Sequence, residues 1–349
     1  MLDDLKYIHH KDAEDALGLA GKQWQQLLHD FSVELPKRAY TNVVHSGMGG
    51  TAAWALLAKQ WPGFSLPFEV VQDYDVPGYV SAQTLFIAAS YSGNTEETLS
   101  ALRQAEGRGA AIVVMTSGGQ LLTIAREKGY PLIELPKIAR PRFGTLYGLK
   151  ALISVGQAAH VLQDASAMTE FSQLSDFLQD QCSQWSPDVP TAKNLAKQIA
   201  HEIMGRTAVM YSGPLLQAAA HKWKLAINEN AHNLAWEGTL PEFSHNEFTG
   251  WTSHPLDKPF AVLFLQSSLD NDRVQKRYDI SERLLSGRWP APEHIEAAGK
   301  TLAEQLLWTT VLGDFVSIYL ALLNGRNPID PSAHDIVEKL KKEMGEYHG

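Results

Sequence analysis

The sequence is almost without cysteine: Cys182 is the only one among 349 residues. Because a single thiol cannot form an intrachain disulfide, the fold must depend on a buried core rather than on covalent crosslinks. The first ten residues, MLDDLKYIHH, carry acidic side chains where a secretion signal would carry basic ones followed by an apolar run. Together these absences predict a cytoplasmic protein.

Positive charge is scarce as well. Lys and Arg number 30 against 39 Asp and Glu, which gives a formal net charge of −9. A nucleic-acid binder needs a basic surface to neutralise phosphates, so the composition argues against a nucleic-acid partner. Small anionic ligands stay compatible with this charge, because they need only a few local donors. With 44% hydrophobic and 20% charged residues, the composition is that of an ordinary folded chain.

Long hydrophobic runs are limited to one segment, residues 306–323. Asp314 lies near its middle, with hydroxyl residues around it. A charge at the centre of a bilayer is costly, so we expect this segment to be a buried core helix and the protein to have no membrane partner.

Between residues 41 and 160, short apolar runs alternate with longer helical periods. The runs are rich in Val, Ile and Leu, which is typical of parallel strands that are covered on both faces. Strands are predicted at 41–47, 68–75, 84–93, 110–118 and 130–136. Helices are predicted at 52–60, 95–106, 120–128 and 145–162.

A second alternation follows a connector at 163–191 that contains one predicted helix, 168–179. It predicts strands at 207–213 and 260–268, and helices at 214–230, 301–324 and 332–344. Thr301 and Glu304 have the spacing of a capping box at the start of one of these helices. Both halves therefore predict an α/β fold, and a shared strand, glycine turn and helix suggests a duplicated unit.

The first predicted strand runs into a glycine-rich loop, Ser46-Gly47-Met48-Gly49-Gly50-Thr51. Glycines let backbone N–H groups approach an anion closely, and a helix N-terminus adds partial positive charge. Gly47, Gly49 and Ala52 also fit a dinucleotide fingerprint, with Asp73 or Asp75 placed to hold a ribose. The loop alone leaves three interpretations open: phosphate binding, a nicotinamide-dependent oxidoreductase, or glycines needed only for packing.

The third predicted strand runs into a second loop, 90–98, with the sequence SYSGNTEET. The hydroxyls of Ser90, Ser92 and Thr95 converge there on another helix N-terminus. Capping by Thr95 or Asn94 explains how that helix begins, but it does not explain the two serines. A phosphate monoester has several oxygens to satisfy, so the two loops together favour phosphate binding.

Several motifs carry a resemblance to a known family. GMGGT at 47–51 and SYSGNTEET at 90–98 resemble the loops of the sugar isomerase (SIS) domain. The resemblance narrows to the bifunctional phosphoglucose/phosphomannose isomerase family through PRFGTLY at 141–147, NEN at 228–230, HNE at 245–247 and LKK at 340–342. It extends from Ser46 to Lys341.

The resemblance implies two SIS-type lobes, each a mainly parallel sheet flanked by helices in three αβα layers. Residues 1–155 would form the first lobe with the phosphate-binding loops, and residues 156–349 a helical connector and the second lobe. The implied activity is the isomerisation of hexose 6-phosphates through an enediolate. Glucose 6-phosphate, and also mannose 6-phosphate, would be converted to fructose 6-phosphate without a cofactor or a metal.

The resemblance also implies roles for particular residues. Glu229, at the end of a helix where the dipole disfavours the ionised form, resembles the family's proton-transferring base. Arg142 resembles the arginine that stabilises the enediolate, and His245 and Lys341 resemble the ring-opening groups, with Lys342 as an alternative to Lys341. The phosphate would be held by Gly50, Thr51, Ser90, Ser92 and Thr95.

In the family the histidine comes from the neighbouring subunit, so the resemblance implies a homodimer in which His245 completes the partner's site. The family usually has serine where Thr51 stands, and the extra methyl group is expected to shift the sugar. A metal site at His232, His245 and His254 is not expected, because their spacing matches no zinc pattern. A non-catalytic sugar-phosphate-binding SIS regulator remains the alternative.

The last predicted helix has an apolar stripe, formed by Ile336, Val337, Leu340 and Met344. We expect this stripe to be buried, with Lys341 at its border. A lysine in the last turn of a helix also complements the dipole, which is a purely structural alternative for Lys341.

Overall fold

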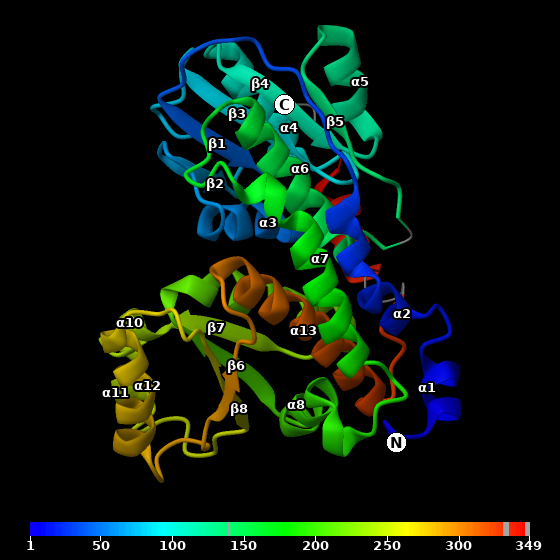
Figure 1. Cartoon of the computed structure of the whole chain (residues 1–349), viewed down its shortest axis with the longest axis vertical. Helices are drawn as coiled ribbons and strands as arrows, with labels where there is room; N and C mark the ends of the chain where they lie inside the picture. The colour runs from blue at the N-terminus through cyan, green and yellow to red at the C-terminus, as the bar shows by residue number, and fades with distance from the viewer. Residues whose placement is uncertain (139, 331–334, 346–349) are drawn as a thin grey trace. The chain divides into compact units, whose positions relative to one another are not determined.

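A computed structural model describes residues 1–138, 140–330 and 335–345. It divides into two compact units (Figure 1). The first lobe comprises Trp24–Ser175 and the terminal segment from Ile336, and the second lobe comprises Met1–Gln23 and Asp176–Asp335. The expected domain boundary after residue 155 falls inside a helix, α6, and stays a prediction.

The first lobe contains a parallel sheet with strand order β2-β1-β3-β4-β5. All five predicted strands of this half are confirmed. Their bounds are β1 Asn42–Ser46, β2 Phe68–Val71, β3 Thr84–Ala89, β4 Ala111–Thr116 and β5 Leu132–Glu134. Every residue of the central strand β3 is buried, which explains why its sequence is apolar without alternation.

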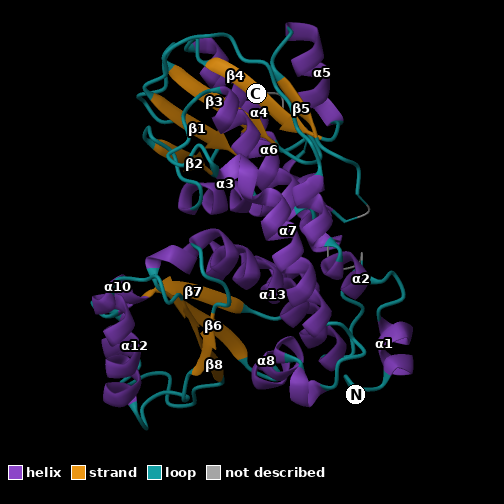
Figure 2. Cartoon of the chain, viewed as in Figure 1, coloured by secondary structure: helices purple, strands orange, loops and turns teal. Residues whose placement is uncertain are grey.

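Helices lie against this sheet (Figure 2). On one face, Val44, Phe86 and Val114 of the strands pack with Leu102 of α4 and Leu121 of α5. Helices α3 and α6 pack against each other. The bounds are α3 Gly49–Gln60, α4 Glu96–Gly107, α5 Gly119–Lys128 and α6 Thr145–Ala158, with the short 3-10 helices η1 Gln23–Leu28 and η2 Pro141–Phe143. Helix α7, Ala167–Gln184, begins in the first lobe and ends in the second.

The second lobe repeats the parallel arrangement, with strand order β7-β6-β8-β9. The predicted strands β6 Thr207–Ser212 and β8 Phe260–Gln266 are confirmed at its centre. The flanking strands β7 Ala235–Thr239 and β9 Glu293–Glu296 were not predicted. Each of them buries one residue, so their sequences, AWEGT and EHIE, lack the apolar run that identifies a covered strand.

The helices of the second lobe include two from the N-terminal residues of the chain, which the sequence did not predict. The bounds are α1 Leu5–Lys11, α2 Ala16–Gly21, α8 Leu195–Ile203, α9 Gln217–Ala231, α10 Leu240–Phe243, α11 Glu247–Gly250, α12 Asp272–Leu285 and α13 Leu302–Leu323. Two 3-10 helices, η3 Thr191–Lys193 and η4 Pro214–Leu216, precede α8 and α9.

Helix α13 contains the long apolar segment, residues 306–323, that was weighed above as a membrane span. It is the one helix among the described residues long and apolar enough to span a bilayer, and its apolar stretch is wholly buried within the lobe. The expected capping box of Thr301 and Glu304 begins it. Trp223 of α9 donates a hydrogen bond from Nε1 to the carbonyl oxygen of Thr309 at 2.6 Å, and Gly313 leaves room for the indole ring. The prediction of a buried core helix is confirmed.

The last helix, α14, spans Asp335–Met344, and the first residues predicted for it, 332–334, lie outside the described part of the chain. The expectation of a buried stripe is wrong for the single chain. Ile336 is 74% exposed, and the other stripe residues Val337, Leu340 and Met344 are exposed as well. An amphipathic pattern predicts that a helix face is apolar, but it does not say which surface covers that face.

Candidate functional site

The glycine loop after β1 forms an open cradle at the carboxyl edge of the first sheet. A Cβ atom at Gly47 would lie 2.8 Å from Cγ2 of Thr51, so this glycine is required by close packing. A Cβ atom at Gly49 or Gly50 would meet nothing within 4 Å, so open space lies over these two residues at the start of α3. The extra methyl group of Thr51 therefore packs toward Gly47.

The hydroxyl loop after β3 brings its three predicted ligands together. The Oγ of Ser90 lies 2.7 Å from Oγ1 of Thr95 and 3.4 Å from Oγ of Ser92, within hydrogen-bond distance of both. Ser90 is buried, and its Oγ also accepts a hydrogen bond from the backbone N–H of Gly93 at 3.1 Å. Thr95 holds the N-cap position of α4, but its side chain makes no capping hydrogen bond. Capping alone therefore does not account for these hydroxyls.

The two loops share one edge of the sheet, because β1 and β3 are adjacent parallel strands and Ser46 pairs in register with Ala88. A Cβ atom at Gly47 would lie 3.0 Å from the carbonyl oxygen of Ala89, directly before the hydroxyl loop. Ligands bind at this edge in open α/β sheets. The expected phosphate-binding residues are thus grouped in the first lobe.

Arg142 lies in η2, which begins after β5 as expected, and its side chain is half-buried. The segment that leads to it is tied to the hydroxyl loop by Tyr91. The Oη of Tyr91 donates to the carbonyl oxygen of Pro136 and accepts from the N–H of Ile138, both at 2.7 Å. The sequence reasoning did not single out Tyr91, and its position between the two serines was the available signal.

Glu229 lies in the second lobe, in the last turn of α9, and is half-buried. The expected apolar side of this helix is confirmed, since Ala219, Trp223 and Ile227 are buried. The amide oxygen of Asn228 accepts a hydrogen bond from the N–H of Ala235 at 3.2 Å. Glu229 is therefore near the amino end of β7, at the amino edge of the second sheet.

His245 lies at the opposite edge of the same sheet. It follows α10, which begins where β7 ends, and its side chain is exposed. The Oη of Tyr211, near the carboxyl end of β6, donates to Oε2 of Glu247 at 2.6 Å and accepts from Nε1 of Trp251 at 3.0 Å. Burial and Glu247 raise the pKa of Tyr211, so the phenol stays a donor. These bonds hold the His245 segment at the carboxyl edge.

Within one chain, then, Glu229 and His245 are not brought together. The five residues of β7 alone span roughly 13 Å, and α9 runs antiparallel to β6 between the two edges.

Lys341 is exposed on α14, where its Nζ donates to Oε1 of Glu338 at 2.8 Å, and Lys342 is exposed next to it.

The possible metal-ligating side chains of the described residues do not form a metal-binding cluster. In the ranges 1–138, 140–330 and 335–345, no group of three or more His, Cys, Asp and Glu side chains has a metal-binding arrangement. The two carboxylates that a dinucleotide site would use for the ribose are hydrogen-bonded within the first lobe. Oδ1 of Asp73 accepts from the N–H of Tyr74 at 2.6 Å, and Oδ1 of Asp75 accepts from Nε2 of Gln104 at 3.1 Å.

Comparison with family models defines the class of both lobes. Residues 43–161 match the model of the SIS domain. Residues 192–344 match the model described as the bacterial phospho-glucose isomerase C-terminal SIS domain. The expected fold of two SIS-type lobes is confirmed.

Whole-chain comparison gives the family. The chain is 32% identical to the bifunctional phosphoglucose/phosphomannose isomerase of Aquifex aeolicus, with 92% of this chain and 94% of the relative covered. It is 31% identical to the protein of that name from Caldicellulosiruptor bescii, with 90% and 94% covered. The chain belongs to the bifunctional phosphoglucose/phosphomannose isomerase family, as the motifs indicated.

Other relatives carry different names. A D-glucosamine-6-phosphate 4-epimerase from Sulfolobus acidocaldarius is 30% identical, with 71% of this chain and 77% of the relative covered. Among solved structures, a glucose-6-phosphate isomerase like protein from Thermus thermophilus has a TM-score of 0.63 at 19% identity, with 98% of both chains covered. This last likeness shows a shared fold.

Proposed function

We propose that the protein isomerises glucose 6-phosphate, and also mannose 6-phosphate, to fructose 6-phosphate in the cytoplasm. The observation that carries the proposal is family membership over nine-tenths of the chain, combined with the open cradle at Gly50 and the hydroxyl cluster of Ser90, Ser92 and Thr95. The family comparison gives no support to a non-catalytic regulator or to a nicotinamide-dependent oxidoreductase.

In this proposal the first lobe holds the phosphate. N–H groups at the start of α3 and the hydroxyls of Thr51, Ser90, Ser92 and Thr95 satisfy its oxygens. Arg142 lies on a segment tied to the hydroxyl loop, so its guanidinium can face the sugar carbons beyond the phosphate. A fixed positive charge there stabilises the oxyanion of the enediolate.

The proton chemistry comes from Glu229 and His245 of the second lobe and from Lys341 on the terminal helix α14. After ring opening, the carboxylate of Glu229 removes the proton from C2 and returns it to C1 while the enediolate forms and collapses. His245, together with Lys341, opens the ring by moving a proton between the ring oxygen and the C1 hydroxyl. Neither step requires a metal or a cofactor, because the charge that develops is met by Arg142.

We also propose that the working unit is a homodimer whose partner donates His245. Three features support it: Glu229 and His245 lie at opposite edges of one sheet, His245 is exposed, and large apolar side chains of the same lobe are exposed. Trp236 on the flanking strand β7 is 55% exposed and Leu256 is 82% exposed. A second copy would cover such side chains and would bring a His245 to each Glu229.

A coupled assay tests the reaction. Purified protein is given glucose 6-phosphate or mannose 6-phosphate in the presence of a chelator, and fructose 6-phosphate is measured. We expect turnover of both, at least a 1,000-fold loss in Glu229→Gln, as for removal of a general base, and no loss in the matched control Glu293→Gln on β9. Absence of fructose 6-phosphate, or conversion of glucosamine 6-phosphate to its C4 epimer instead, would contradict the proposal.

A further inference from the structure

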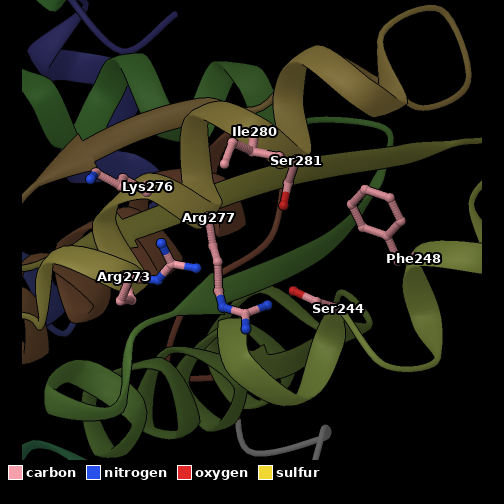
Figure 3. A pocket seen from close by; sticks show the side chains of 7 residues that line it. All are labelled: Ser244, Phe248, Arg273, Lys276, Arg277, Ile280 and Ser281. Atoms are coloured by element: carbon pink, nitrogen blue, oxygen red, sulfur yellow. The ribbon is translucent and has the colours of Figure 1, made fainter.

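A pocket outside the proposed catalytic residues lies in the second lobe, between α12 and the α10–α11 segment. Its volume is about 250 Å³, close to the lower end for small-ligand sites. Three cations from α12 line it: Arg273, Lys276 and Arg277. Figure 3 shows the side chain of Arg277 extending toward Ser244, with the Arg273 guanidinium on the same side of the helix.

These three positive charges lie close together on one helix of a chain whose net charge is −9. No carboxylate of a described residue lines the pocket, and none of the three cations forms an ion pair with another described residue. Their spacing of three and four residues places like charges on neighbouring positions of one helix, which is unfavourable for the helix itself. Arg273 is also the second residue of α12, where the dipole disfavours a cation. A bound anion would remove both penalties.

The rest of the lining suits the non-charged part of a small molecule. Phe248 and Ile280 give apolar surface, and the hydroxyls of Ser244 and Ser281 offer hydrogen bonds. Ser281 is buried at the floor of the pocket, whereas Arg277 is half-buried and Arg273 is exposed at its mouth. The pocket therefore combines exposed positive charge with a buried hydroxyl and two apolar side chains, Phe248 and Ile280.

We infer that this pocket is a second anion site, which binds a phosphorylated small molecule distinct from the substrate held by the loops of the first lobe. The guanidinium groups of Arg273 and Arg277 bind the phosphoryl oxygens as planar forks, and Lys276 adds a third charge. The ring of the ligand lies against Phe248. The phosphoryl group is the shared chemistry of two sources, a sugar phosphate and a nucleotide.

Binding at this pocket affects the proposed reaction through Ser244, a consequence that rests on the proposed function. Ser244 lines the pocket and directly precedes His245. A ligand that bridges α12 and Ser244 restricts the segment that carries the ring-opening imidazole. Binding itself does not depend on the isomerase proposal.

Calorimetric titration of the full chain tests the inference, with 6-phosphogluconate, AMP and inorganic phosphate as probes. We expect two phosphoanion sites per chain in the wild type and one in Arg273→Gln/Arg277→Gln. A first-lobe variant, Ser90→Ala/Thr95→Ala, should keep the α12 site alone. Combining both pairs should weaken the remaining binding at least tenfold. Arg283→Gln, an exposed arginine on α12 that does not line the pocket, is the matched control and should change nothing.

The outcomes separate this site from the proposed active site. A single phosphoanion per wild-type chain, or unchanged binding in the combined variant, overturns the inference. If the first-lobe variant does not fold, the wild-type stoichiometry against that of Arg273→Gln/Arg277→Gln decides the question. Tighter binding of AMP that is lost in Phe248→Ala identifies a nucleotide, and tighter binding of 6-phosphogluconate identifies a sugar phosphate. Loss of isomerase activity with intact α12 binding refutes the proposed function alone.

Discussion

The carboxylate of Asp270 lies against Gly213 in the second lobe. A Cβ atom at Gly213 would be 2.0 Å from Oδ2 of Asp270, and Oδ1 accepts a hydrogen bond from the N–H of Leu215 at 3.4 Å. Gly213 follows β6 and Asp270 follows β8, the two central strands, just as the glycine and hydroxyl loops follow β1 and β3. In the second lobe, a carboxylate of the chain itself thus occupies the space beside the glycine that follows the central strand β6.

This arrangement predicts the effect of neutralising Asp270. Burial raises the pKa of its carboxyl, so the folded chain holds the proton more tightly than the unfolded chain. The contribution of Asp270 to the free energy of unfolding is therefore lower at a pH above its folded pKa. It increases as the pH is lowered through that pKa. Asp270→Asn should keep the wild-type free energy of unfolding at pH 7, instead of losing the ~1–3 kcal/mol usual for a charged acceptor. Urea unfolding of both proteins measures this, and a loss in that range refutes it.

His45 predicts an acid-sensitive stability. It is completely buried on β1, neither ring nitrogen has a hydrogen-bond partner among the described residues, and burial lowers its pKa from 6.5 to about 3. At a pH between those two values, the unfolded chain binds a proton at His45 that the folded chain does not bind. The free energy of unfolding therefore decreases as the pH is lowered, by up to ~1.4 kcal/mol per pH unit. His45→Leu should flatten the dependence of urea midpoints on pH, and the exposed control His201→Gln should not. Equal slopes for His45→Leu and wild type would contradict the prediction.

The buried ion pair of Lys222 and Asp314 predicts a large loss on breaking it. The side chains are 4% and 1% exposed, and Oδ2 of Asp314 also accepts from Nε2 of Gln23 at 2.9 Å. Asp314→Ala leaves a buried ammonium without its partner and should cost about 3–5 kcal/mol, while Lys222→Met/Asp314→Leu should recover much of this. Arg206→Ala, which breaks an exposed pair with Glu202, should cost at most about 1 kcal/mol. Guanidinium denaturation compares the variants, and similar losses for both single changes would be inconsistent with this account.

The hydroxyl cluster predicts a binding defect. Ser90→Ala removes a group that contacts both Ser92 and Thr95, so hexose 6-phosphates should bind about 10–100-fold more weakly, as for the loss of a hydrogen bond to a charged group. The effect should fall on KM more than on kcat. Ser100→Ala on α4, the helix that follows this loop, is the control. A fall in kcat at constant KM would argue that Ser90 does not hold the phosphate.

Subunit sharing can be tested by complementation. Glu229→Gln and His245→Ala should each be inactive, because each removes one of the two groups from every site. Co-expression of the two variants should restore roughly a quarter of wild-type activity, since half the dimers are mixed and each has one intact site. Mixed dimers that form, as shown by differently tagged chains, and stay inactive would refute a shared site.

The sequence predicted strands correctly where a continuous apolar run was enough to identify them. The strands β3, β4, β6 and β8 are largely apolar because they are buried on both faces, so they were recognised. The flanking strands β7 and β9 were missed, because the backbone pairs they complete are not encoded by apolar runs. The stripe on α14 was recognised as apolar but wrongly expected to be buried.

By itself the sequence determined the local chemistry: the two loops, the NEN and HNE segments, the buried helix around Asp314 and the family to which the chain belongs. Only the tertiary structure decided that Glu229 and His245 lie at opposite edges of one sheet, that Asp270 packs against Gly213, and that Arg277 of α12 extends toward Ser244. The physical reason is range. Propensity, capping and apolar pattern act between near neighbours in the chain, whereas a shared cavity or edge depends on how strands distant in sequence pair.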